Sequence, residues 1–240
     1  MTRPPNAPHL GAMFSGDDQD WEFAKWLALL CMLANHVALA LLPPWHDLGS
    51  LIGRVSLPVF ALLIVLRLRI DTEARALRYL KRLAIWGLIA QPVYQWLLYD
   101  GSPGRLNVLF TLMMGVGLIY LAQVATLRLA LLAAGLVMLG TFWLDGGAWM
   151  PLAQLAAWLL LSRSPSRPWP AMLLMSAMAA AMNIHPEYGP WHVLIAALAI
   201  PLTVFLSPRL SARLPRMPGL MFYGFYPAHL AIILLVFGPY

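Results

Sequence analysis

Four polar side chains that could do chemistry lie inside long apolar stretches of this sequence: His36, Arg54, Gln91 and His229. Ionisable groups are costly to place in hydrocarbon, so those found inside membrane segments usually mark a functional interior. An imidazole can take or give a proton near neutral pH. A guanidinium can stabilise negative charge that develops during a reaction. These residue types therefore form a candidate site, provided that the chain brings them together.

The elements that must position these groups are membrane helices. The chain has 240 residues, of which 61% are hydrophobic and 11% charged, whereas a soluble domain carries about 25% charged residues. The apolar runs are continuous, which favours helices over the alternating segments of a transmembrane barrel. The predicted fold class is all-α, a polytopic transmembrane helix bundle. Its net charge of +6 is placed between the runs, which indicates contact with the lipid bilayer and no nucleic-acid partner.

Nine candidate spans are predicted, with the N-terminus in the cytoplasm. Residues 1–23 are expected to form a mobile tail and residues 24–240 a single transmembrane bundle. With nine spans, 14 of the 16 Lys and Arg residues lie inside and only Arg54 and Arg105 outside, as the positive-inside rule requires. Without the short sixth span the division would be 9 to 7. The nine spans cover roughly residues 24–42, 48–66, 83–98, 106–122, 127–144, 148–161, 169–183, 191–206 and 220–237.

Depth along these spans places the four polar residues in one layer. At a rise of about 1.5 Å per residue, His36 and Arg54 lie about 9 Å from the outer ends of their spans. Gln91 lies about 10 Å and His229 about 12 Å from the outer ends of theirs. The layer is therefore expected in the outer half of the bilayer, where a guanidinium cannot easily reach water.

A purely structural role fits some of these residues equally well. Gln91 and Gln95 lie one turn apart and could hydrogen bond to neighbouring helices. Tyr226 shares a helix face with His229 and could simply orient it. Prolines inside the spans are predicted hinges, because each removes a backbone hydrogen bond and frees a carbonyl group. The hinge prolines are Pro58, Pro92, Pro201 and Pro227.

The basic segment 67–82 is a second candidate site, on the cytoplasmic side. If it is helical, Arg75, Arg78 and Arg82 share one face, with Lys81 at its edge. Arginine binds phosphate groups bidentately, so the segment could clamp a nucleotide-bearing cofactor. The alternative is a helix that binds anionic lipid. No His, Cys or carboxylate spacing indicates a metal site, and no metal is expected.

Five stretches, in order along the chain, resemble the TraX family, named for the conjugative-plasmid protein that acetylates the N-terminus of pilin. They are KWLALLCMLANHVAL, GRVSLPVFALLI, RYLKRLAIWGLIAQPVY, RLNVLFTLMMGVGLIYL and FYGFYPAHLAII. The resemblance implies a multi-pass acetyltransferase of the bacterial inner membrane that uses acetyl-CoA as co-substrate and pilin as acceptor. The chain is also distantly similar to membrane acyltransferases that modify sugars, which makes an envelope glycan a second expected acceptor.

The resemblance assigns roles to particular residues. His36, Arg54, Asn107 and His229 match family positions, and Asn35 stands where the family usually has Asp. His36 is expected to be the general base and Arg54 the group that stabilises the thioester oxygen, with His229 or Asn107 in support. Acetyl-CoA would bind through its phosphates to the basic segment.

Two other classes of protein remain open from the residues. A small-molecule transporter or channel could use the same buried His and Arg layer to bind substrate or relay protons. A scaffold for pilus or envelope assembly would need no such layer.

Overall fold

In the residues that it describes, the computed structural model consists of helices and their connections, with an isolated bridge between Leu106 and Leu144. These are residues 21–41, 44–69, 73–124, 126–145, 147–164, 166–185 and 188–239, so nearly all of the predicted N-terminal tail lies outside them. The α-helices are α2 (Glu22–Ala40), α3 (Pro44–Gly53), α4 (Ser56–Arg69), α5 (Glu73–Tyr99), α6 (Val108–Val124), α7 (Leu127–Leu139), α8 (Trp149–Arg163), α9 (Trp169–Ala181), α10 (Pro190–Leu210) and α11 (Gly219–Phe237). Two short 3-10 helices, Gly140–Trp143 and Ser211–Arg213, follow α7 and α10.

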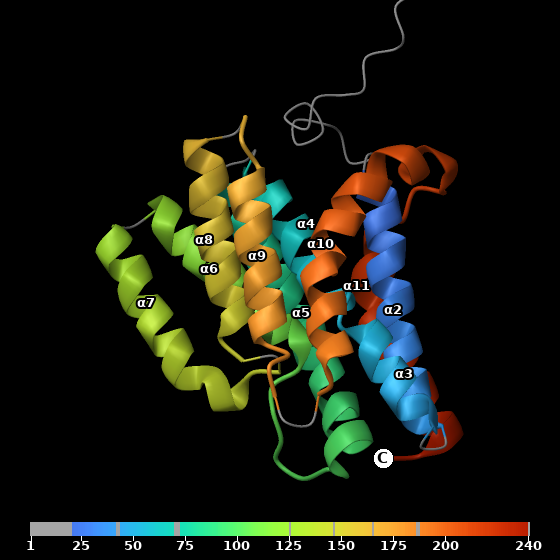
Figure 1. Cartoon of the computed structure of the whole chain (residues 1–240). Coiled ribbons are helices and arrows are strands. Elements are labelled where there is room, and N and C mark those ends of the chain that lie inside the picture. The colour runs from blue at the N-terminus through green and yellow to red at the C-terminus, as the bar shows by residue number, and fades with distance from the viewer. Residues whose placement is uncertain are drawn as a thin grey trace, which may run out of the picture.

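The helices form one bundle, with α4 near its centre and α7 at its edge (Figure 1). The first and the last helix, α2 and α11, contact each other directly, and α11 also packs against α5. Helix α3 packs against α2, where the backbone of Gly49 lies so close to Ala38 that an added Cβ would clash. The chain therefore returns to its starting helix, which places α2 and α11 side by side.

The composition of the helices identifies a membrane protein. Within the described residues, four segments are long and apolar enough to cross a membrane: Glu22–Ala40, Trp45–Arg69, Pro190–Arg213 and Gly219–Phe237. Helices α6 and α9 are shorter apolar candidates, which gives four to six spans. Large apolar side chains such as Leu88 (65% exposed) and Leu235 (85% exposed) cover the outside of the bundle. The predicted class, an all-α polytopic membrane protein, is confirmed.

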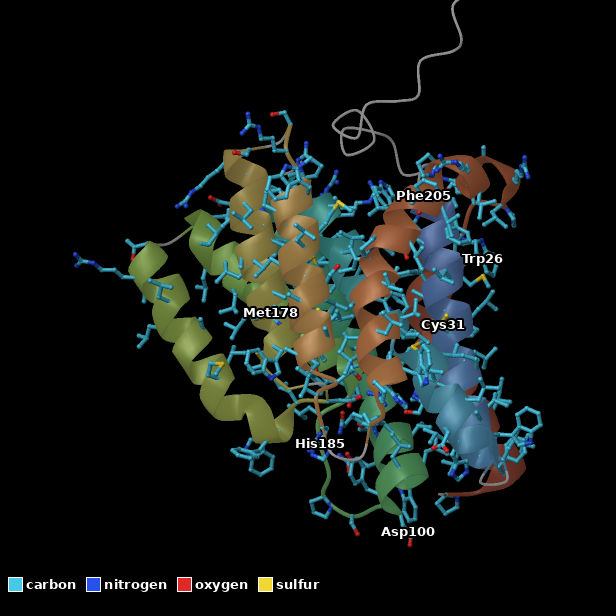
Figure 2. The ribbon with its side chains drawn as sticks, viewed as in Figure 1. Trp26, Cys31, Asp100, Met178, His185 and Phe205 are labelled. Carbon is cyan, nitrogen blue, oxygen red and sulfur yellow. The ribbon has the colours of Figure 1, made fainter. Side chains whose placement is uncertain are left out.

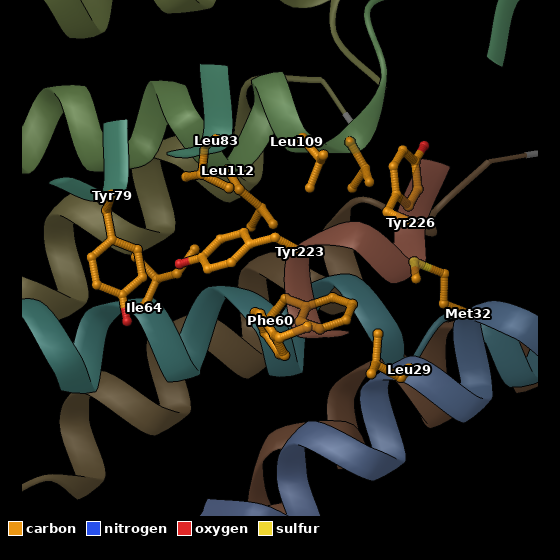
Figure 3. Close-up of a pocket in the computed structure, with 12 residues that line it drawn as sticks. Leu29, Met32, Phe60, Ile64, Tyr79, Leu83, Leu109, Leu112, Tyr223 and Tyr226 are labelled. Carbon is orange, nitrogen blue, oxygen red and sulfur yellow. The ribbon is translucent and has the colours of Figure 1, made fainter. Parts of the chain in front are cut away.

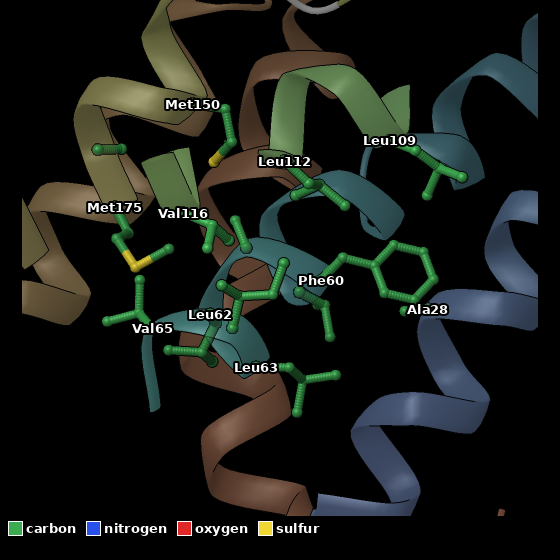
Figure 4. Packing of buried hydrophobic residues seen from close by; sticks show 14 of the residues in the cluster. Ala28, Phe60, Leu62, Leu63, Val65, Leu109, Leu112, Val116, Met150 and Met175 are labelled. Atoms are coloured by element: carbon green, nitrogen blue, oxygen red, sulfur yellow. The ribbon is translucent and has the colours of Figure 1, made fainter. Parts of the chain in front are cut away.

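Helix α4 forms the centre of the core. It is apolar on all sides, as expected of a helix surrounded by other helices, and nearly all of its residues are buried. Phe60, Leu62 and Val65 of α4 pack among apolar side chains from the neighbouring helices, including Leu112 of α6 and Met150 of α8 (Figure 4). This buried helix is a fixed wall against which the site is built.

The predicted span 48–66 falls within the candidate membrane span Trp45–Arg69, but its helix is interrupted. Helix α3 ends at Gly53 and α4 begins at Ser56, so the break falls at Arg54 and Val55. Pro58 explains this position, because its ring lacks an N–H and clashes with the carbonyl group of the residue four positions earlier, which is Arg54. Arg54 therefore lies at the break between α3 and α4.

Two further boundaries differ from the expectation. From Glu73 onward, the basic segment and the third predicted span form one continuous helix, α5, which has 27 residues and contains Pro92. Arg67 and Arg69 belong to the end of α4. The predicted span 127–144 is helical only to Leu139 in α7 and then tightens into the 3-10 turn Gly140–Trp143.

Candidate active site

Two histidines from opposite ends of the chain meet inside the bundle. His36 Nδ1 lies 2.9 Å from His229 Nε2, although the two residues are 193 positions apart in the sequence. The side chains are 8% and 4% exposed, and their ring centroids lie 5.0 Å apart. Tyr226, one turn before His229, contacts both rings edge-on. The structure therefore joins α2 and α11 through an imidazole pair.

The hydrogen bonds determine where the protons of this pair lie. His229 Nδ1 is 2.7 Å from the carbonyl oxygen of Phe225, and because a carbonyl only accepts, this nitrogen must carry the proton. In a neutral ring, His229 Nε2 then has a lone pair and accepts a hydrogen bond from His36 Nδ1. In the neutral ring of His36, Nε2 is therefore the nitrogen that carries no proton.

His36 opens onto a cavity of about 710 Å³, called here the histidine cavity. It lies at the end of the bundle where His185 is placed, away from Trp26 (Figure 2). This is the end that the sequence assigns to the outside. The polar side chains that line it include those of Asn35, His36, Arg54, Asp145, Tyr188 and Tyr226.

Arg54 lines the same cavity as His36 and is held from two sides. Its Nε donates to the carbonyl oxygen of Ser50 at 3.1 Å, and its NH2 group donates to Ser50 Oγ at 2.7 Å. Tyr188 covers it, with the guanidinium carbon 4.3 Å from the ring centroid. A guanidinium has five N–H donors, so these two bonds leave donors for a ligand. In the described part of the chain no carboxylate forms an ion pair with Arg54.

Asn35 lies beside the helix break. A Cβ atom on Gly53 would come within 2.6 Å of the Asn35 side chain, so only glycine allows this close approach. Asn35 thus lines the histidine cavity, as Arg54 does, while His36 hydrogen bonds to His229 and to the backbone of Met32. The position where the family usually has Asp therefore lies against Gly53, the residue before Arg54.

The amide residues of the predicted layer are placed elsewhere. Asn107 is fully buried, and its Nδ2 donates to the carbonyl oxygen of Gly87 and to Gln91 Oε1 at 2.9 and 2.8 Å. Its Oδ1 accepts from the backbone N–H of Leu109, which caps the start of α6. Gln91 and Gln95 both donate to the carbonyl oxygen of Arg105. None of the three amides lines the histidine cavity, so the structure does not bring them to the imidazole pair.

A second cavity, the basic cavity, lies at the other end of the bundle and has a volume of about 390 Å³. Arg75, Arg78 and Arg82 line it from α5, whereas Lys81 is not part of its lining. Three further cations were missed by sequence reasoning because they come from separate elements: Lys25, Arg67 and Arg216. The only indication of these three residues in the sequence was that the positive-inside rule assigns all of them to the cytoplasmic side.

A buried carboxylate holds this end together. Glu22 is fully buried, its Oε1 bonds to Lys25 Nζ at 2.7 Å, and its Oε2 accepts from the backbone N–H of Met217 at 2.8 Å. The start of α2 is thereby fixed to the segment that leads into α11. The same two helices are linked at the other cavity by the imidazole pair.

Sequence reasoning also missed Asp145 and Tyr188 in the histidine cavity. Both lie in connections between helices, after α7 and before α10. Hydropathy assigns such residues to the surface and gives no indication that both line a cavity, where Tyr188 covers the half-buried Arg54.

The fold and the two cavities define a polytopic helical membrane protein with a buried imidazole pair facing one side and a cationic cavity facing the other. The chain belongs to the TraX family, since the family described as TraX protein matches residues 21–237. The resemblance found in the sequence is thus confirmed over most of the chain. No curated protein and no solved structure matches it.

Proposed function

We propose that this TraX-family protein is an acetyltransferase of the bacterial inner membrane that moves an acetyl group from acetyl-CoA to an acceptor amine or hydroxyl. The observation that carries the proposal is that His36, which is hydrogen-bonded to the buried His229, lines the histidine cavity together with Arg54. The family is linked to acetylation of the pilin N-terminus, which supports pilin as acceptor. A hydroxyl of an envelope glycan is the other candidate acceptor.

The donor would bind from the cytoplasmic side. The basic cavity collects cations from four parts of the chain in one hollow, as expected of a site for the several phosphates of CoA. Arginine predominates there, and its planar fork suits phosphate oxygens better than a lysine does. Arg75, Arg78 and Arg82 are the proposed phosphate ligands, and Lys25, Arg67 and Arg216 complete the positive field.

The orientation needed for this scheme agrees with the charge distribution. Counting the interrupted pair α3–α4 as one crossing, the helices from α2 to α11 would cross the membrane nine times, with α2 starting in the cytoplasm. The basic cavity would then face the cytoplasm and the histidine cavity the envelope side, where pilin and glycans are found. A donor and an acceptor from opposite compartments would meet within one protein.

The reaction follows from the proton positions. His36 Nε2 would remove the proton from the acceptor nitrogen or oxygen as that atom attacks the thioester carbonyl carbon. Arg54 would donate hydrogen bonds to the oxyanion of the tetrahedral intermediate. Collapse of the intermediate would break the carbon–sulfur bond and form the amide or ester. The CoA thiolate would then take the proton back from His36.

The first experiment tests the base. Purified protein is incubated with radiolabelled acetyl-CoA and either a peptide with the pilin N-terminus or an envelope glycan, and label in the acceptor is counted. We expect His36→Ala to lower transfer by about 10²- to 10⁴-fold, the usual contribution of a general base. His46→Ala, which changes a half-buried histidine outside the histidine cavity, is the control.

The controls for this experiment are folding and donor binding. His36→Ala should remain monodisperse in detergent and should bind CoA as the parent does, because His36 lies outside the basic cavity. Transfer at the parent rate by this variant would exclude His36 as the base. Absence of transfer by the parent to amine and hydroxyl acceptors alike would refute the proposed function.

A further inference from the structure

A third, narrow cavity lies between the basic cavity and the histidine cavity. Its volume is about 30 Å³, and its lining is almost entirely apolar. Phe60 of α4 and Phe222 of α11 form one of its walls, with their ring centroids 5.4 Å apart. A volume of this size holds only one or two waters, so the passage is nearly closed as it stands. It is called here the apolar passage (Figure 3).

The apolar passage shares lining residues with both larger cavities, so the three hollows form one line through the bundle. The residues shared with the basic cavity are Ile64, Tyr79, Phe222 and Tyr223. The residues shared with the histidine cavity are Met32, Val108 and Tyr226. Figure 3 shows Tyr79 at one end of this passage and Tyr226 at the other, with Tyr223 between them.

The geometry limits what could occupy this line. Lys25 in the basic cavity and His36 in the histidine cavity are 11 residues apart on α2, which corresponds to about 16 Å at the rise of an α-helix. The basic cavity and the histidine cavity at the two ends are wide and polar, whereas the passage between them is narrow and apolar. A ligand that fills all three parts has a phosphorylated head and a thin, uncharged arm that carries a reactive end.

The cytoplasmic end of the passage also offers polar atoms. The hydroxyl groups of Tyr79 and Tyr223 hydrogen bond to each other, and the Arg82 guanidinium lies 5.8 Å from the Tyr223 ring. Two hydroxyl groups at the entrance of the apolar passage can hydrogen bond to amide groups of a narrow ligand. These amide groups would otherwise lose their hydrogen bonds to water without compensation.

We propose that the apolar passage holds the pantetheine arm of CoA, so that the thioester emerges beside His36 while the nucleotide phosphates stay in the basic cavity. This inference rests on the proposed function for the identity of the donor, and it adds the path that the donor takes through the bundle. Tyr79 and Tyr223 form the entrance, and Leu112 of α6 lines the middle. When the pantetheine arm fills the passage, it displaces little water and excludes ions from the three connected cavities. The protein therefore transfers an acyl group without opening a pore.

The test is capture of CoA by a thiol placed in the passage. Leu112→Cys is made in a Cys31→Ala parent, since Cys31 is the only cysteine of the chain. The probe is the mixed disulfide of CoA with 2-thiopyridine. The introduced thiolate attacks the CoA sulfur, forms a protein–CoA disulfide and releases 2-thiopyridone, which is followed by absorbance and by the mass of the protein.

The matched control is Val116→Cys in the same parent. Val116 is one turn further along α6 and fully buried, but it does not line the passage. We expect capture at position 112 to be at least tenfold faster than at position 116, and excess acetyl-CoA should slow it. Leu109→Cys, which also lines the passage, replaces Leu112→Cys if that variant is unstable.

A second part of the experiment distinguishes binding of the phosphate groups of CoA from binding of its pantetheine arm. Replacing Arg75, Arg78 and Arg82 by Gln should slow capture of the CoA probe about tenfold. It should not slow capture of the corresponding pantetheine probe, which has no phosphates. Equal slowing of both probes would contradict the division of the ligand between the two cavities.

The outcomes distinguish the path from the reaction. Equal capture at positions 112 and 116, or none at 112 and 109, in a parent that transfers acetyl from acetyl-CoA would refute the passage and leave the proposed function intact. Fast capture at 112 in a parent that transfers nothing would support a CoA-binding passage and refute the proposed reaction. Neither capture nor transfer would refute both.

Discussion

Two sets of buried polar side chains lie in neighbouring parts of the bundle, and they differ in how their hydrogen bonds are used. The amides of Gln91 and Asn107 bond to each other and to backbone groups of α5 and of the segment before α6. In the pair of His36 and His229, the two imidazoles bond to each other, and His36 lines a cavity. Burial alone therefore does not mark a candidate reactive group in a membrane protein. A hydrogen-bonded imidazole that lines a cavity is a better candidate.

After replacement of His36 itself, replacement of Arg54 is expected to have the largest effect on activity. Arg54→Gln should lower kcat about 100-fold or more, the cost of removing one donor to a developing oxyanion. The KM for acetyl-CoA should stay the same, because Arg54 is not in the basic cavity. Steady-state kinetics with labelled acetyl-CoA measures both constants.

The control for Arg54 is another arginine of the same cavity. Arg105→Gln removes an exposed guanidinium from the lining and should leave kcat within a factor of about two. If Arg54→Gln and Arg105→Gln lost the same activity, only the general charge of the cavity would matter.

A smaller effect is expected at His229, which is a positioning residue. His229→Ala should lower kcat about 10- to 100-fold, as is usual when the partner that orients a functional histidine is lost. His229→Gln should recover much of this loss, because its amide oxygen can accept from His36 Nδ1. Kinetics of the two variants, with KM unchanged, distinguish this role from a packing role. A Gln variant that folds but is no better than Ala would contradict it.

The next effect concerns donor binding. Replacing Arg75, Arg78 and Arg82 together by Gln should raise the KM for acetyl-CoA about tenfold, with kcat nearly unchanged, because charge-assisted bonds to phosphates are lost. Lys81→Gln is the matched control, since Lys81 neighbours these residues on α5 but lies outside the lining of the basic cavity. Equal KM values for all variants would exclude these three arginines as ligands of the acetyl-CoA phosphates.

The smallest effect on activity is expected at Asn107. Asn107→Ala removes the cap of α6, which costs about 1 kcal/mol, and it leaves the Gly87 carbonyl without its donor. The unfolding midpoint in detergent should fall, while kcat per folded molecule stays unchanged. Asn107→Asp keeps the capping oxygen and should lose less stability. A lower kcat at an unchanged midpoint would assign Asn107 to the reaction and end the distinction between the two sets.

The sequence allowed prediction of the elements of the site better than of their contacts. The helix class followed from hydropathy, and the helix face that carries Arg75, Arg78 and Arg82 followed from the helical repeat. The polar layer was partly correct: depth can be counted along one helix, but the partner of His36 depends on which helices are neighbours. Nothing in the spacing indicates that α2 packs against α11.

The interruption at Arg54 was detectable only in part. Pro58 indicated a hinge, and the rule for proline places the lost contact four residues earlier. Seeing that the hinge would end one helix and start another needed the packing of Gly53 on Asn35 and of Gly49 on Ala38. Asp145 and Tyr188 were beyond prediction, because the folding of connections over a cavity depends on the whole bundle.

The bond between His36 and His229 has a consequence for biosynthesis. Its two halves are separated by 193 positions, and the nine α-helices α2 to α10 are synthesised before α11, which carries the second imidazole. Under the proposed function, every nascent chain that ends before His229 should be inactive in acetyl transfer. Synthesis of the last helix completes both ends of the site, because α11 supplies His229 and also Phe222 and Tyr223, which line the basic cavity.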